Sequence, residues 1–142
     1  MKLARIGNPG KEKPIIVDKD NNYRDVSSVI KDFNSDNLNF ETLEKLNNIK
    51  PEDLPILEKN QRIGACVNNP SKFIGIGLNF KDHAIEQNMP IPKEPIIFSK
   101  FTNSVSGPND DIVIPKNSNH TDWEVELGFV IGKKCSYVSE KD

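Results

Sequence analysis

The sequence comprises 142 residues, of which 28% are charged and 35% hydrophobic, and its formal net charge is −2. This balance argues against the basic surface that nucleic-acid binding requires, and no stretch approaches the roughly 18 consecutive apolar residues of a membrane-spanning helix. The first residues also lack the apolar run of a secretion signal. We therefore expect a cytoplasmic protein with no nucleic-acid or membrane partner, built as one ordinary domain or two small ones.

The two cysteines, Cys66 and Cys135, are too few for a disulfide framework and fit no metal-ligand spacing. We expect both to be reduced, partly buried thiols.

The first half of the chain predicts short strands separated by turns, followed by short helices. β-branched and apolar runs punctuated by glycine, proline and asparagine indicate strands at residues 2–6, 14–17 and 23–26. Serines 27 and 28 are candidate caps for a helix over residues 29–33. Asn39 is a candidate cap for a second helix over residues 40–46.

The pattern changes between residues 66 and 72, which predicts two domains, 1–69 and 70–142. The second is expected to hold strands and one helix, the strands at residues 73–78, 96–98, 112–114 and 123–131. The last of these is the most regular strand pattern in the chain. Asn79 is a candidate cap for a helix from residue 80 to about residue 88. The fold class expected is mainly β with minor α.

Two acidic residues, Glu124 and Glu126, alternate with apolar ones in the segment DWEVELG, residues 122–128. Because side chains alternate across a strand, both carboxylates would point to the same side, roughly 7 Å apart. Such a pair disfavours its own ionisation unless a cation lies between the two groups. Hard oxygen ligands favour Mg²⁺, Mn²⁺ or Ca²⁺. The alternative is that both glutamates simply line the solvated face of an antiparallel strand.

A histidine and a glutamate, His83 and Glu86, are three residues apart in a predicted helix and so share one face. A carboxylate beside an imidazole fixes its tautomer and favours a base usable near neutral pH. An ordinary surface pair is the alternative. His120, the only other histidine, falls in a polar loop. Lys100, at the end of a predicted strand, is a candidate for binding an anionic substrate, and a solvated lysine is its alternative.

Four segments taken together resemble the fumarylacetoacetate hydrolase family. In order along the chain they read GIGLNFKDHAIE at 75–86, FSK at 98–100, GPND at 107–110 and DWEVELG at 122–128. The first residues also look like the small leading domain of bacterial members, a subgroup that includes acylpyruvate and 2,4-diketo-3-deoxy-sugar-acid hydrolases. The resemblance implies an incomplete β-roll of that family preceded by a small N-terminal α+β domain.

The resemblance also implies the chemistry of the site. Glu124 and Glu126 match metal-binding carboxylates of the family, and His83 with Glu86 matches its catalytic pair. A 2-oxo or 1,3-dicarbonyl acid would be the small-molecule substrate. A bound cation would polarise its carbonyl while His83 activates water, giving carbon–carbon cleavage. Movement of a proton in place of water attack would give isomerisation. Family members are commonly dimers, so a homodimer is expected for a full-length protein.

The family's catalytic domain extends well beyond the Glu-x-Glu strand and supplies a third carboxylate ligand there, whereas this sequence stops at residue 142. We therefore expect the N-terminal part of a longer enzyme. Ureidoglycolate lyase-type activity, or an inactive fragment that acts only as a binding or structural module, are the alternatives.

Overall fold

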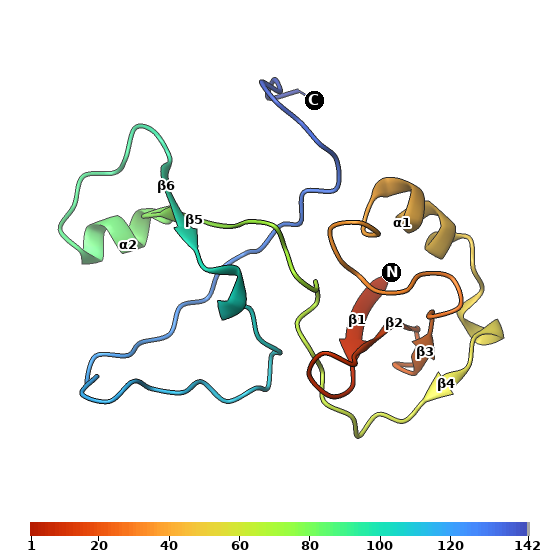
Figure 1. Ribbon diagram of the computed structural model, residues 1–142. Coiled ribbons are helices and arrows are strands. Elements are labelled where there is room, and N and C mark those ends of the chain that lie inside the picture. Colours follow the sequence, from red (N-terminus) through yellow and green to blue (C-terminus); the bar gives the residue numbers. More distant parts are fainter. Residues whose placement is uncertain (142) are drawn as a thin grey trace.

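The computed structural model describes residues 1–141, which form two parts joined by a long connection (Figure 1). The first part holds four strands and one α-helix: β1 (Lys2–Ile6), β2 (Lys13–Val17), β3 (Tyr23–Asp25), α1 (Phe40–Asn47) and β4 (Ile56–Leu57). The second holds two strands and one α-helix: β5 (Phe73–Gly77), α2 (Lys81–Glu86) and β6 (Ile96–Lys100). The mainly β class with minor helices is confirmed.

The four strands of the first part form an antiparallel sheet in the order β1-β2-β3-β4. Turn chemistry sets this order. Gly7 and Gly10 adopt positive φ angles in the connection from β1 to β2, a conformation that glycine reaches without a steric penalty. In the β2–β3 turn, Asp18 accepts hydrogen bonds from the backbone amides of Asp20 and Asn22. A side chain that satisfies its own turn in this way favours a tight hairpin.

The hydrophobic core lies between this sheet and the loop and helix that follow it. Its buried members are Ile16, Val26, Ile30, Phe33 and Leu46. Leu46 is the buried residue of α1, and Phe33 is the largest fully buried side chain. Only Ala84 is a buried hydrophobic residue within residues 70–141, so the apolar core of the described chain belongs to its first part.

Helix α1 begins where the sequence predicts. Asn39 has an extended backbone, and its side chain accepts a hydrogen bond of 2.9 Å from the amide of Thr42, which satisfies one of the free donors at the helix start. The helix predicted at residues 29–33 is wrong. Only a turn forms, with the amides of Val29 and Ile30 both bonded to the carbonyl of Val26. Ile30 and Phe33 are nevertheless both buried.

The second part is built on an antiparallel ribbon in which β5 pairs with β6. Gly75 lies opposite Phe98, and a Cβ added at Gly75 would come within 2.4 Å of the phenyl ring. A side chain at this position would therefore have to displace the Phe98 ring, which packs closely over its cross-strand neighbour. The strands predicted at residues 73–78 and 96–98 are confirmed with small shifts of their ends.

Two other strand predictions are wrong. Residues 112–114 and 123–131 have no regular secondary structure, although both carry the apolar pattern of strands. Within residues 1–141 their backbone amides and carbonyls are paired with no neighbouring strand. A strand exists only through hydrogen bonds to a partner, so the pattern alone cannot form one.

The predicted helix from residue 80 is confirmed in type but is shorter, ending at Glu86. Its N-cap is Phe80 and not Asn79, and Phe80 makes no side-chain capping bond. Cys66 and Cys135 are both free thiols, and both are exposed, which corrects the expectation that they would be partly buried. The division into domains 1–69 and 70–142 stays a prediction. No helix within residues 1–141 has the length and apolarity needed to cross a bilayer.

Candidate functional site

Helix α2 carries both members of the predicted catalytic pair. His83 is half-buried and lies in the middle of the helix, while Glu86 is its last residue and is exposed. Three residues apart, they fall on the same side of the helix. The described structure contains no hydrogen bond or ion pair between them. Each side chain is therefore free to meet a substrate or to bond to the other.

The predicted metal ligands Glu124 and Glu126 lie in the extended, exposed segment 123–131. One contact ties this segment to the start of α2: the side-chain amide of Asn79 donates a hydrogen bond of 3.2 Å to Oε2 of Glu126. The same amide nitrogen donates a bond of 2.8 Å to the carbonyl of Ile76 at the end of β5. Asn79 thus connects the acidic segment to the helix that carries His83. The sequence analysis did not include Asn79 among the candidate site residues.

The backbone just before Asn79 is strained. Leu78 has a φ of +48°. This left-handed conformation is uncommon for any residue except glycine, and especially for a bulky one. Such strain is found most often where a chain must present a side chain in a fixed direction. Here it turns the chain from β5 into α2, at the residue before the one that bonds to Glu126. In the sequence, only the pair Leu78-Asn79 between a predicted strand and a predicted helix marks this position. Such a pair is too common to have identified Asn79 as a site residue.

Lys100 is the last residue of β6 and is exposed. Its ammonium lies 5.8 Å from the centroid of the Phe73 ring, directly opposite in the ribbon. This distance is within the range of a cation–π contact, which is weak at an exposed site. The role of Lys100 in binding substrate stays a prediction.

Carboxylate oxygens are the right kind of donor for Mg²⁺ or Mn²⁺, and Glu124 and Glu126 offer them. Their number is insufficient, however. Nowhere among residues 1–141 do three His, Cys, Asp or Glu side chains gather closely enough to hold a metal ion. The described chain therefore supplies part of a donor set and not a closed site.

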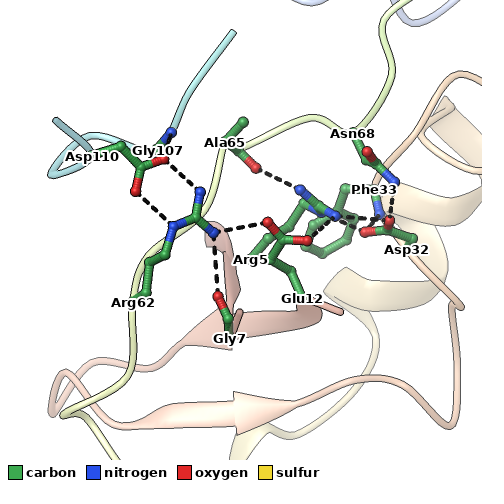
Figure 2. Close-up of polar contacts among 10 residues, drawn as sticks. All are labelled: Arg5, Gly7, Glu12, Asp32, Phe33, Arg62, Ala65, Asn68, Gly107 and Asp110. Carbon is green, nitrogen blue, oxygen red and sulfur yellow. Dashed lines mark hydrogen bonds and ion pairs between the residues drawn. The ribbon is translucent and has the colours of Figure 1, made fainter. Parts of the chain in front are cut away.

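The structure also reveals an ion-pair network that the sequence analysis missed (Figure 2). Arg5 is buried and donates two hydrogen bonds to Asp32, of 2.6 and 3.0 Å. It also contacts the carboxylate of Glu12 at 3.3 Å. Arg62 donates a hydrogen bond of 2.9 Å to the other carboxylate oxygen of Glu12. It donates two more to Asp110, of 2.6 and 2.5 Å. The network thus links the first sheet to the turn at residues 107–110.

Charge compensation makes this network structural. The two hydrogen bonds from Arg62, followed by the amide of Gly107, hold the pKa of Asp110 below its usual value. Burial works against ionisation of Glu12, yet bonds from Arg62 and the charge of Arg5 outweigh it, so its pKa is also lowered. Glu12 and Asp110 therefore both remain ionised at neutral pH.

A cavity of about 220 Å³ adjoins the network, lined by Arg5, Glu12 and Arg62 together with residues 102, 103, 105 and 106. None of the predicted site residues lines it. Three carboxylates, from Glu12, Asp32 and Asp110, neutralise its two guanidinium groups. The cavity therefore has no surplus positive charge to attract an anionic substrate.

A sequence signal for the network did exist. Arg5, Arg24 and Arg62 are the three arginines of a chain otherwise rich in lysine. All three are in ion pairs with largely buried carboxylates, Arg24 with Asp18 at 2.8 Å. Arginine suits such sites because its planar group bonds to carboxylates at two points. The rarity of arginine pointed to these positions, although not to their partners.

Comparison with known proteins agrees with this mainly β architecture. Residues 72–142 match the family model described as fumarylacetoacetate (FAA) hydrolase C-terminal. The chain belongs to the fumarylacetoacetate hydrolase family. It superposes on the crystal structure of a "putative HpcE protein" from Mycobacterium smegmatis with a TM-score of 0.60 and 25% identity, covering 79% of this chain and 40% of that one.

Similar sequences include proteins named "Putative hydrolase" from Burkholderia multivorans and Burkholderia lata, each 54% identical over 140 residues. The alignment covers 99% of this chain and 50% of each relative. These relatives therefore match both parts of the chain, the first part as well as the second part that matches the family model. The chain spans about half the length of the curated relatives it matches.

Proposed function

We propose that this chain contributes the N-terminal half of a divalent-metal-dependent enzyme that cleaves a carbon–carbon bond of a 2-oxo or 1,3-dicarbonyl acid, or isomerises such an acid. Acylpyruvates and 2,4-diketo-3-deoxy-sugar acids are the substrates that the resemblance favours. Membership of the family supports the reaction class, and the names of the relatives support hydrolysis for those proteins.

The observation that carries the proposal is the hydrogen bond from Asn79 to Glu126. Forty-seven residues separate these positions in sequence, yet the bond brings the Glu-x-Glu segment to the junction of β5 and α2. His83 lies about one helical turn beyond Asn79, within α2. This contact supports a site shared by the acidic segment and the candidate base.

In this proposal His83 accepts a proton from a water molecule, which then attacks a carbonyl carbon of the substrate. Glu86, on the same helical side, orients the imidazole and stabilises its protonated form. Lys100 attracts the carboxylate of the substrate. A bound cation would supply polarisation of the substrate carbonyl, with Glu124 and Glu126 among the groups that hold it. Whether bond cleavage or proton movement follows depends on groups outside this site.

The test is an assay of acylpyruvate consumption in the presence of Mg²⁺ or Mn²⁺. The ultraviolet absorbance of the acylpyruvate reports its loss. The 142-residue chain is assayed alone and fused to the half of the Burkholderia multivorans relative that the alignment does not cover. We expect turnover in the fusion. His83→Ala should lower kcat by about 100-fold or more, because a general base contributes at least that factor.

His120→Ala is the matched control, because His120 lies in an exposed loop and should leave kcat unchanged. Equal effects of the two substitutions would remove His83 from the mechanism. A fusion that folds and binds Mn²⁺ but turns over none of these acids would contradict the proposed reaction class.

A second candidate is a non-catalytic binding or structural module. The incomplete donor set within residues 1–141 favours it. It predicts that the chain associates with other polypeptides, while neither the chain nor the fusion turns over substrate.

A further inference from the structure

Three of the candidate site residues, His83, Glu86 and Lys100, lie on one segment, residues 70–106, which contains β5, α2 and β6. The one buried hydrophobic side chain of this segment is Ala84, so apolar packing does not fasten the segment to the first part. The structure also shows no hydrogen bond or ion pair between residues 70–106 and residues 1–69. Where residues 102–106 approach the first part, both line the cavity of about 220 Å³.

The segment is anchored at its two ends. Before it, the amides of Gly64 and Asn68 donate hydrogen bonds of 2.8 and 2.7 Å to carbonyls of the first part. After it, Asp110 returns to the same connection and accepts two hydrogen bonds from Arg62. No other hydrogen bond or ion pair joins residues 1–69 to residues 70–138. One end of the segment is thus held by the covalent chain, and the other by a single ion pair.

The turn at residues 107–110 meets a rigid partner, because the guanidinium of Arg62 is itself fixed (Figure 2). It donates hydrogen bonds of 2.9 Å to Oε1 of Glu12 and 3.2 Å to the carbonyl of Gly7. Gly107 is buried against the same connection, and a Cβ added there would collide with the carbonyl oxygen of Ile63. A backbone carbonyl cannot move aside as a flexible side chain can, so any side chain at this position would push the turn away.

We infer that Arg62, Gly107 and Asp110 form a joint that fixes residues 70–106 relative to the first part, and that they are positioning residues of the candidate site. A segment held at one end samples many orientations, and closing the loop at its other end removes this freedom. The joint closes the chain across 48 residues. It gives a role to the GPND segment, which the proposed reaction leaves unused. Its effect on catalysis rests on the proposed function, whereas its effect on the position of the segment does not.

The test measures the distance from the first part to α2 in the 142-residue chain, by pulsed electron spin resonance between two nitroxide labels. One label is on Cys66, which is exposed and lies between the anchored residues Gly64 and Asn68. The other is on Gln87→Cys, at the exposed C-cap of α2. Cys135→Ser removes the remaining thiol. We expect one narrow distribution of distances.

Two substitutions open the joint in different ways. Asp110→Ala removes the carboxylate, and Gly107→Ala places a methyl group against the carbonyl of Ile63. Each should at least double the width of the distance distribution, while circular dichroism shows the first part still folded. Asp111→Ala and Gly128→Ala are the matched controls, because Asp111 is exposed and a Cβ at Gly128 would meet nothing within 4 Å. A broad distribution in the unmodified joint, or equal widths in variants and controls, would overturn the inference.

Kinetics of the fusion described above give a second readout. Asp110→Ala should lower kcat by about tenfold or more, because misplacing a reacting group by about 1 Å can cost about 100-fold in rate. Asp111→Ala should leave kcat unchanged. An active fusion with the same kcat in both variants would overturn the positioning role. A fusion that is inactive before any substitution contradicts the proposed reaction instead, and the distances then decide the inference by themselves.

Discussion

The side-chain amide of Asn79 joins the end of β5 to the carboxylate of Glu126, with hydrogen bonds of 2.8 Å to the carbonyl of Ile76 and 3.2 Å to Oε2 of Glu126. In the described structure this is the bond through which the acidic segment meets the helix of the candidate base. Both residues are exposed, so the bond directs the segment without strongly stabilising the fold.

Asn79→Asp should release the acidic segment, because a carboxylate placed against Glu126 repels it. Tryptic cleavage after Lys133 and Lys134 should then accelerate by about threefold, corresponding to a lost hydrogen bond worth about 0.6 kcal/mol. Asn119→Asp, the same change in an exposed loop, is the control. Cleavage rates that are equal in the two variants would show that the Asn79–Glu126 bond does not hold the segment.

Glu124→Gln and Glu126→Gln should each weaken Mn²⁺ binding by about tenfold or more, since even changes behind a metal ligand cost about 10–100-fold in affinity. Binding is measured by the electron spin resonance of free Mn²⁺, in the fusion to the relative's uncovered half. Glu140→Gln, an exposed glutamate further along the chain, should leave the affinity unchanged. Unaltered binding in all three variants would assign Glu124 and Glu126 to a solvated surface.

The Arg62–Asp110 pair should make stability depend on pH. The folded pKa of Asp110 lies below its usual value, chiefly because Arg62 bonds to it. A lowered folded pKa stabilises the fold fully above the unfolded pKa, and this stabilisation is lost as pH falls through the folded value.

Asp110→Asn should therefore lower the urea midpoint at pH 7, and its difference from the unmodified chain should shrink below about pH 4, where aspartates begin to protonate. Asp111→Asn is the matched control, because Asp111 is exposed and forms no ion pair within residues 1–141. A difference that persists unchanged at the lowest pH would mean that the Asp110 charge is not the cause.

Phe33→Ala should destabilise the first part by about 3–5 kcal/mol, because it empties the position of the largest fully buried side chain. Phe101→Ala, at a side chain 86% exposed, should change the free energy of unfolding by less than about 0.5 kcal/mol. Urea unfolding followed by far-ultraviolet circular dichroism gives both values. Comparable losses would place the core elsewhere.

Local features of the fold followed from the sequence. The strands at β1, β2 and β3 were predicted within a residue or two of their ends, because glycine, proline and asparagine fix the turns between β-branched runs. Helix α1 was predicted from Asn39, whose side chain satisfies the helix start without help from distant residues. The strand over residues 73–77 was likewise predicted from its local apolar run, within a residue of its observed end.

The candidate site was predicted only in part. His83 and Glu86 are correctly placed on a helix, because their spacing is local. Asn79 was interpreted as a cap, whereas its side chain reaches back to Ile76 and across to Glu126. The catalytic and metal-binding roles themselves remain predictions.

By itself, the sequence determined what nearest neighbours decide: turns, a helix cap, and the order of motifs that reveals the family. Only the tertiary structure decided that Arg62 meets Asp110 across 48 residues. It also decided that residues 123–131, despite the strongest strand pattern, join no sheet within residues 1–141. The physical reason is the same in both cases. An ion pair and a strand each need a second partner brought close in space, and no periodicity in one segment contains the position of that partner.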